Sequence, residues 1–423
     1  LDPRPEFVMF AGDEIVGLTA DEAELRDQWR HWLHVEMAWL DRSSVPLYNS
    51  TSNHTTYDTM SERVFADVLD HLPRNGPPDQ RGLSYSVRRD DLLIVFVNTC
   101  WSGLGGEGHV ETDWLDEVLG RHRDARHKLV VGHHPAFPVN GFSGEYQREI
   151  GRSDRDRFWE TLVRNEVAAY LCSHILAFDV QVHRGVLQVV SAGAGTAHRM
   201  PAETEYLHCV QATIDEAGRR YQVVDRAGKV RERLTWPPSP APSGHWQPLP
   251  VEDGDDAISF PDPAEPNRAD PGLDPAEPDP DTMVALRIAG TTAADEDGRP
   301  QTLLAALPTG GALSGLWIGL TGTDQRLTVT VSPQAGRSPH YWFGPTFEPG
   351  RAFETQIALH PGMGPGGIMH RADDGSPWSS LTSSSPWGLE RLAWPARWTV
   401  GHTGGPTASA RFRGTGLSID HHG

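Results

Sequence analysis

The segment Leu-Val-Val-Gly-His-His-Pro at residues 129–135 decides the fold, because an apolar run ends there in a glycine, two imidazoles and a proline. An apolar run closed by Gly and Pro is typical of a buried strand that leaves its sheet. Working outward, three more polar motifs follow apolar runs: Gly12-Asp13, Ser52-Asn53-His54 and Cys172-Ser173-His174. The sequence therefore predicts a cluster of polar side chains at the ends of several strands.

Together the four motifs offer one carboxylate, one amide oxygen and two imidazoles. These groups are a ligand set for one divalent transition metal, namely Zn²⁺, Mn²⁺ or Fe²⁺. The predicted ligands are Asp13, Asn53, His133 and His174. The competing interpretations are ordinary ones: a capping carboxylate at Asp13, a polar turn at residues 53–54 and a strand-end histidine at His174.

Residues 1–235 alternate strand-like and helix-like segments, which indicates an α/β domain with two sheets packed together and flanked by helices. Thr19-x-x-Glu22 predicts a capping box that opens the first helix. Further helices are expected over residues 62–72, 112–119 and 155–163, strands over 7–10, 92–97, 129–131 and 167–172, and strand pairs over 178–191 and 206–225.

The rest of the chain changes character twice. Residues 236–282 hold thirteen prolines and eleven acidic residues against one arginine, so we expect an extended linker. Residues 283–423 contain short apolar runs separated by Gly, Pro and Ser, which predict an all-β sandwich domain. Most of the tryptophans in this part are expected in its core, and one or two exposed ones would stack on sugar rings.

Charge and composition exclude some functions. The formal net charge is −20, of which the linker supplies −10, and the mildly acidic remainder argues against nucleic-acid binding. No run of 18 apolar residues exists, so no membrane span is expected. The three cysteines, Cys100, Cys172 and Cys209, lie in apolar strand-like runs and are expected to be buried free thiols.

In their order along the chain, the four motifs resemble those of the calcineurin-like metallophosphoesterases, which include the purple acid phosphatases. The resemblance covers roughly residues 5–225 and includes Pro46-x-Tyr48 before the Asn-His motif and Trp114-Leu115 in the helix before His133. It implies a metallophosphoesterase-like fold with a two-metal site where loops leave the sheet edges. The C-terminal part loosely resembles laminin-G or concanavalin-like sandwiches.

Carried over residue by residue, the resemblance implies that Asp13 bridges the two metals, while Asn53, His133 and His174 complete the site of one. It implies that His54 is not a ligand but either protonates the leaving oxygen or stabilises charge on the phosphoryl group. Asp13 and His54 are therefore the predicted catalytic residues.

The sequence also departs from the family pattern. The family's Asp-x-His motif does not precede Asp13, and Leu176 stands where the last motif should carry its second histidine. In the family, the missing Asp-x-His motif and the missing last histidine bind the other of the two metals, so at most one tightly bound metal is predicted. A cropped N-terminus would explain the first loss only, whereas a repurposed site explains both.

We therefore expect a metal-dependent hydrolase of phosphate esters with a small or polymeric substrate, a polysaccharide among the candidates. One alternative is the same fold repurposed to cleave a glycan or another substrate without phosphate. The other is a non-catalytic protein that binds carbohydrate or a surface.

Overall fold

The computed structural model describes residues 4–142, 149–193, 200, 205–216, 218–236, 246–249, 283–294, 299–308, 315–332, 338–373, 375–383, 385–389, 396–400 and 412–422. Most of the predicted linker at 236–282 lies outside these residues. None of the described helices is both long and apolar enough to pass through a membrane.

Contacts between residues divide the chain into two compact units. The first consists of residues 1–139, 144–179 and 185–207, and the second of 140–143, 180–184 and 208–423. Residues 208–235, which the sequence assigned to the first domain, thus cluster with the second unit. The domain boundaries at 235 and 283 stay predictions.

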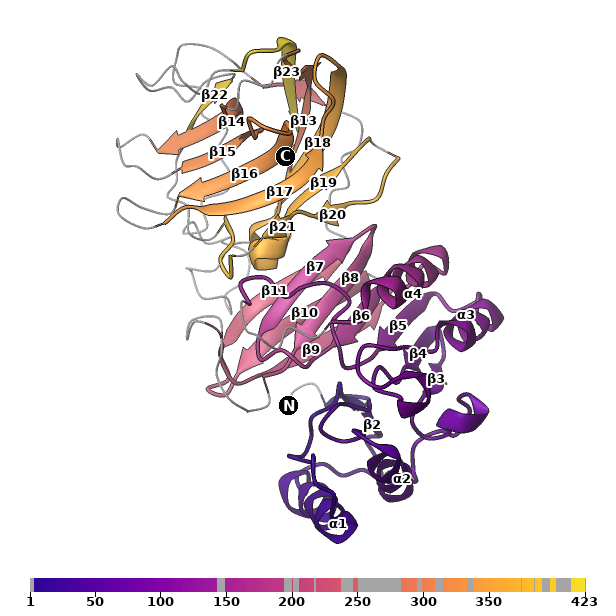
Figure 1. Ribbon diagram of the computed structural model, residues 1–423. Coiled ribbons are helices and arrows are strands. Elements are labelled where there is room, and N and C mark those ends of the chain that lie inside the picture. The colour runs from indigo at the N-terminus through magenta and orange to yellow at the C-terminus, as the bar shows by residue number, and fades with distance from the viewer. Residues whose placement is uncertain are drawn as a thin grey trace. The chain divides into compact units, whose positions relative to one another are not determined.

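The first unit contains strands β3, β4, β5, β6 and β8 of a six-stranded sheet with the order β3-β4-β5-β6-β8-β7 (Figure 1). Strands β4, β5, β6 and β8 run parallel, and β3 pairs antiparallel with β4. Residues 93–96 of β4 are all buried, as expected for a parallel strand covered on both faces. The bounds are β3 Tyr85–Arg89, β4 Leu92–Phe96, β5 His127–Val131, β6 Ala169–Cys172, β7 Phe178–His183 and β8 Val186–Ser191.

A separate pair of parallel strands, β1 (Val8–Phe10) and β2 (Leu47–Asn49), carries the first two motifs. Helices α1 (Glu22–His31) and α2 (Thr59–Val68) pack on each other near this pair, and α3 (Thr112–Arg121) packs on α4 (Arg152–Arg164) beside the large sheet (Figure 1). Short helical turns cover Trp32–Glu36, Pro78–Gln80 and Ser102–Leu104.

Both early helices begin elsewhere than the sequence predicted. Asp21, not Thr19, is the N-cap of α1, and its carboxylate accepts hydrogen bonds from the amides of Ala23 and Glu24. An aspartate caps well and adds a negative charge at the positive end of the helix dipole. Helix α2 starts at Thr59 because Asp58 forms a capping box with Ser61, and it ends at Val68 rather than residue 72.

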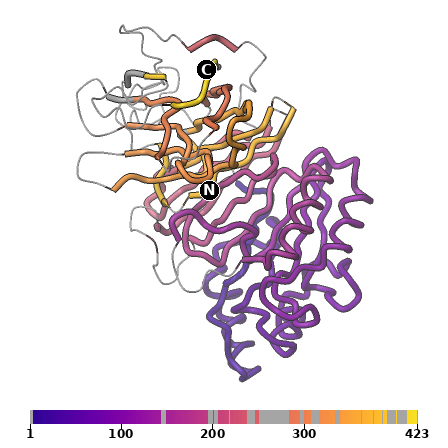
Figure 2. Tube along the Cα trace, turned by 45° about the horizontal axis from the view of Figure 1, so that its top comes forward, coloured from indigo at the N-terminus to yellow at the C-terminus, as the bar shows by residue number. Residues whose placement is uncertain are grey.

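The second unit contains a three-stranded antiparallel sheet, β11-β10-β9, and two six-stranded sheets. Figure 2 follows the backbone of the chain, and the C-terminal part runs from orange to yellow. The six-stranded sheets have the orders β12-β23-β13-β18-β19-β20 and β21-β17-β16-β15-β14-β22. The bounds are β9 His208–Asp215, β10 Gly218–Asp225, β11 Val230–Trp236, β12 Gln247–Pro248, β13 Val284–Thr291, β14 Gln301–Pro308, β15 Gly315–Leu320, β16 Arg326–Ser332, β17 His340–Thr346, β18 Ala352–Leu359, β19 Ile368–Arg371, β20 Ser379–Ser380, β21 Thr382–Ser383, β22 Ala396–Val400 and β23 Thr415–His422, with a 3₁₀ segment at Pro361–Gly367.

One hydrophobic core joins the two six-stranded sheets. In β16, Leu327, Val329 and Val331 are fully buried, while the alternate residues Thr328 and Thr330 are half-buried. Leu286 and Ile357 reach the same core from the opposite sheet. This period of two is the mark of a strand with one face on a core. The predicted α/β class and the C-terminal β-sandwich are therefore confirmed.

The cysteines follow the prediction in two of three cases. Cys100 and Cys172 are free and buried, whereas Cys209 is free and exposed. Cys209 lies on β9, an edge strand with several exposed residues, so burial of this thiol was predicted wrongly.

Candidate metal site

Four strands of the first unit deliver the predicted ligands. Asp13 follows β1, Asn53 follows β2, His133 follows β5 and His174 follows β6. The structure brings these four side chains together. Their roles as ligands stay predictions.

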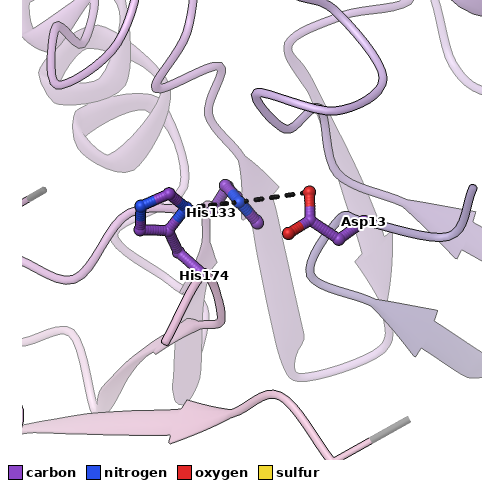
Figure 3. A group of neighbouring side chains, drawn as sticks. All are labelled: Asp13, His133 and His174. Atoms are coloured by element: carbon purple, nitrogen blue, oxygen red, sulfur yellow. Dashed lines mark hydrogen bonds and ion pairs between the residues drawn. The ribbon is translucent and has the colours of Figure 1, made fainter. Parts of the chain in front are cut away.

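The ligand atoms converge closely (Figure 3). One oxygen of Asp13 and one ring nitrogen each of His133 and His174 all lie within 4.8 Å of one another. His133 Nε2 lies 3.3 Å from Asp13 Oδ1, 3.1 Å from His174 Nδ1 and 2.9 Å from Asn53 Oδ1. A fourth distance, 3.2 Å between His174 Nδ1 and Asn53 Oδ1, closes the group. Among the described residues, this is the one group of three His, Cys, Asp or Glu side chains placed to hold a metal.

The hydrogen bonds of His133 show which of its nitrogens faces the cluster with a lone pair. Its Nδ1 lies 2.8 Å from the carbonyl oxygen of Ala11, and since a carbonyl only accepts, Nδ1 carries the proton. In the neutral ring Nε2 then has a free lone pair, and it points at two oxygens that also carry lone pairs. Metal-bound histidines characteristically donate their other N–H to a backbone carbonyl in this way.

The Asp13 carboxylate is the negatively charged group of this cluster. Its Oδ1 is buried and has no hydrogen-bond partner among the described residues. Burial by itself would raise the pKa of Asp13, but attraction to His133 outweighs it and holds that pKa well below the usual range. Burial likewise acts to lower the pKa of His133, and the Asp13 charge reverses the sign, so the pKa of His133 is raised. A buried anion beside two imidazoles and an amide oxygen is an arrangement that a cation completes, either a proton on His133 or a metal ion.

Backbone geometry holds the cluster in place. Asp13 and His174 have left-handed φ angles of 61° and 68°, which are uncommon outside glycine. Gly12 has φ 100°, and a Cβ there would lie 2.6 Å from His133 Nδ1 and 2.6 Å from Ser52 Cβ. The hydroxyl of Ser52 accepts a 3.0 Å hydrogen bond from the Asp13 amide.

His54, the predicted proton donor, is half-buried beside the cluster. Its Nδ1 lies 2.7 Å from the carbonyl oxygen of Val16, so Nδ1 carries a proton and Nε2 is the nitrogen available for proton exchange. Its charge also acts to lower the pKa of Asp13. Gly17 packs on the backbone of His54, where a Cβ would lie only 1.6 Å from the His54 carbonyl oxygen.

Sequence reasoning missed Thr99, which supports the two histidines after β5. The Thr99 hydroxyl accepts from the amides of His133 and His134 at 3.3 and 3.2 Å, and it lies 2.9 Å from His134 Nδ1. Burial and the two neighbouring imidazoles hold the pKa of His134 well below its usual range, so this ring is neutral. The position of Thr99 just after β4 was the one available signal, since β4 is the neighbour of β5 in the sheet.

Glu14, next to Asp13, is a second buried carboxyl. It accepts a 2.8 Å hydrogen bond from the side-chain amide of Asn49, and its Oε2 has no partner among the described residues. Burial raises the pKa of Glu14 to about 7. Its hydrogen bond with Asn49 ties the loop after β1 to the end of β2.

The cluster borders an open cavity of about 610 Å³. Asn53 lines it together with Tyr57, Cys100 and the glycine-rich segment 105–108. Its volume is that of a small-ligand site, and Asn53 is the one candidate ligand among its lining residues.

No family model matches this chain, and no curated protein matches it. Among solved structures, a purple acid phosphatase from seeds of yellow lupin, Lupinus luteus, is similar at 14% identity and a TM-score of 0.39, over 50% of this chain and 43% of the lupin chain. GAP50, the anchor in the inner membrane complex of Plasmodium, is similar at 11% identity and a TM-score of 0.33, over 52% of this chain and 85% of that chain.

The CBM40 module of a Ruminococcus gnavus IT-sialidase, bound to α2,6-sialyllactose, is similar at 12% identity and a TM-score of 0.25, over 33% of this chain and 76% of that module. This chain thus spans less than half of the lupin protein. All three TM-scores lie below 0.5, so the functional argument rests on the geometry of the site.

Proposed function

We propose that this protein is a metal-dependent hydrolase of phosphate esters that uses one metal site. The observation that carries the proposal is the convergence of Asp13, His133 and His174 within 4.8 Å, with Asn53 Oδ1 in direct reach of both imidazoles. Four distant chain segments, each placed by the end of a strand, supply these groups.

The donor set fits a divalent transition metal. A carboxylate and an amide oxygen combined with two imidazoles suit Zn²⁺, Mn²⁺ or Fe²⁺. When bound, such a metal supplies Lewis-acid polarisation of a phosphoryl oxygen and acidifies a water molecule. Asp13, Asn53, His133 and His174 would hold it, with the Ala11 carbonyl fixing the ring of His133.

His54 would supply the proton. The Val16 carbonyl fixes its ring and leaves Nε2 as the nitrogen that exchanges protons with a substrate. A protonated His54 can then donate from Nε2 to the oxygen of the departing alcohol, and general acid catalysis of this kind typically contributes about 10²–10⁴-fold to a rate. The cavity beside Asn53 would receive the alcohol part of the ester.

The test is hydrolysis of a chromogenic phosphomonoester and a chromogenic phosphodiester by the full chain loaded with Zn²⁺, Mn²⁺ or Fe²⁺. We expect His54→Ala to lower kcat by at least about 100-fold while the bound metal is retained. His31→Ala, an exposed histidine on α1, is the matched control and should leave kcat unchanged. Hydrolysis of neither ester by the loaded protein would reject the proposal and leave the two alternatives, a reaction on a substrate without phosphate or a non-catalytic binding role.

A further inference from the structure

The outer face of the sheet that contains β15, β16 and β17 carries exposed aromatic rings. Tyr341 and Phe343 are 45% and 37% exposed, although both are large hydrophobic residues. They lie two residues apart on β17, hence on the same face, and their rings stack at 6.5 Å between centroids and 17° between planes. Trp342 between them is fully buried in the core.

Hydroxyl groups lie beside these rings. Thr328 pairs with Phe343, and Thr330 pairs with Tyr341 on one side and with Trp317 on the other. The face thus presents flat apolar rings next to a row of hydroxyls on the neighbouring strand. We call the set Trp317, Arg326, Thr328, Thr330, Tyr341 and Phe343 the aromatic strip.

Arg326 adds a positive charge to the strip. Its guanidinium lies over the Phe343 ring at 5.2 Å from the centroid, and its Nε donates to the Gly344 carbonyl at 2.8 Å. Within the described part of the chain, no carboxylate forms an ion pair with it. In a protein of net charge −20, a guanidinium without an acidic partner beside exposed rings is well suited to an incoming anion.

We propose that the aromatic strip binds an acidic polysaccharide, one whose pyranose rings carry carboxylates. A pyranose has an apolar face of C–H groups that packs on a flat aromatic ring, and hydroxyls around its rim that hydrogen-bond to Thr328 and Thr330. Its carboxylate pairs with the planar fork of Arg326. The occupant is a carbohydrate rather than a purely apolar partner, because charge and hydroxyls lie directly beside the rings.

This inference does not depend on the proposed phosphoesterase activity. The strip belongs to the C-terminal sandwich and its residues are distinct from Asp13, Asn53, His54, His133 and His174. Binding by the strip and hydrolysis at the metal site can therefore succeed or fail separately.

The test is isothermal titration calorimetry of the full chain with polygalacturonate, whose pyranose units carry carboxylates, and with its neutral methyl ester. We expect the acidic polymer to bind at least about tenfold more tightly than the ester, which is the discrimination that one charged hydrogen-bonded pair gives. Phe343→Ala and Arg326→Gln should each weaken binding by about tenfold or more. The matched controls are Trp39→Ala, an aromatic 62% exposed on the first unit, and Arg351→Gln, an exposed arginine of the second unit.

If Arg326→Gln fails to fold, Tyr341→Ala still tests the strip. The Ser383 hydroxyl donates to the backbone carbonyl of Tyr341, and this substitution keeps that carbonyl. Failure of the wild type to bind polygalacturonate would overturn the proposal. Equal binding of the neutral ester would overturn the role of charge. Equal or tighter binding of dextran sulfate or single-stranded DNA would show a general polyanion surface instead, and unchanged affinity in the three strip variants would place the binding elsewhere.

Discussion

Two of the four candidate ligands have strained backbone conformations. Asp13 and His174 both adopt left-handed conformations, and Gly12 directly precedes Asp13 with a positive φ of its own. Left-handed backbone at a non-glycine residue costs about 1–3 kcal/mol, so surrounding contacts must enforce it. Residues under such strain cluster at binding and catalytic sites, which agrees with a site that positions its ligands before the cation arrives.

Gly12 provides a test at the scale of one residue. In Gly12→Ala the new methyl would lie 2.6 Å from His133 Nδ1, so it must push the ring off the Ala11 carbonyl. We expect metal affinity to fall by about 10–100-fold, as it does when the support of a ligand histidine is lost. Isothermal titration with Zn²⁺ measures this affinity.

Gly228→Ala is the control for Gly12→Ala. Gly228 also has a positive φ, 81°, but a Cβ there meets nothing within 4 Å. It should bear the same kind of backbone strain and leave metal affinity unchanged. Equal losses in the two variants would mean that the contact with His133 has no effect on the site.

The sequence predicted the candidate ligand side chains but not the backbone contacts that orient them. Motifs at strand ends singled out Asp13, Asn53, His133 and His174, and the structure brings all four together. The carbonyls of Ala11 and Val16 orient His133 and His54, and any residue type supplies a carbonyl, so no sequence pattern marks these contacts. The left-handed backbone at Asp13 is equally unmarked, because the sequence pattern alone does not show which non-glycine residues adopt it.

At the scale of elements, the start of α1 shows how a local signal can be displaced. Thr19-x-x-Glu22 has the spacing of a capping box, yet Asp21 lies closer to the first turn and its side chain accepts from two helix amides. Thr19 instead donates to Glu24 and accepts from the Asp21 amide. When two residues that can cap a helix lie two positions apart, sequence spacing alone does not show which of them is the N-cap.

The cap assignment predicts an asymmetry between two substitutions. Asp21→Ala removes the acceptor for the Ala23 and Glu24 amides and should destabilise by about 1 kcal/mol, which corresponds to a fall in Tm of about 2–4 °C. Thr19→Ala should change the Tm by less than half of that. Differential scanning calorimetry of the two variants decides the question, and a larger fall for Thr19→Ala would restore the capping box predicted from sequence.

Strands were easier to predict than helix ends. The short apolar runs that predicted the C-terminal sandwich lie within strands, at residues 284–288, 316–320, 327–331, 353–359 and 397–400. Alternating or continuous apolarity over a few residues is a direct signal of a buried strand. Helix α2 ended four residues before the predicted end, since apolar residues such as Leu69 and Leu72 stay buried in the turn that follows it.

At the scale of the whole molecule, the predicted ligands come from four separate segments of the first unit. A cation that binds only the folded unit stabilises it by mass action, by about 2.7 kcal/mol when the free ion is at 100 times its Kd. The second unit has its own core and none of these ligands. Bound metal should therefore raise the stability of the first unit and leave that of the second unit unchanged.

This argument predicts the effect of metal removal on thermal unfolding. Chelation should lower the transition of the first unit and leave that of the second unit in place, with reversal on addition of Zn²⁺ or Mn²⁺. Calorimetry with and without chelator measures both transitions. In His174→Ala the metal-dependent shift should disappear, and its persistence there would locate the responsible ion outside the cluster.

The fold class was readable at this scale, but the grouping of β9, β10 and β11 was not. These strands follow the α/β part directly in sequence, so local pattern assigned them to it, whereas their contacts cluster with the second unit. Which neighbour a short antiparallel sheet packs on is decided by tertiary contacts that no local pattern carries.

The central claim is that Asp13, Asn53, His133 and His174 hold one cation, and the metal content of the purified protein tests it most directly. After equilibration with Zn²⁺, Mn²⁺ or Fe²⁺ and removal of free ion, elemental analysis should give about one metal per chain for the wild type and for His54→Ala. His133→Ala and His174→Ala should lose that metal. A wild type without bound metal, or a content that both ligand variants leave unchanged, would contradict the account.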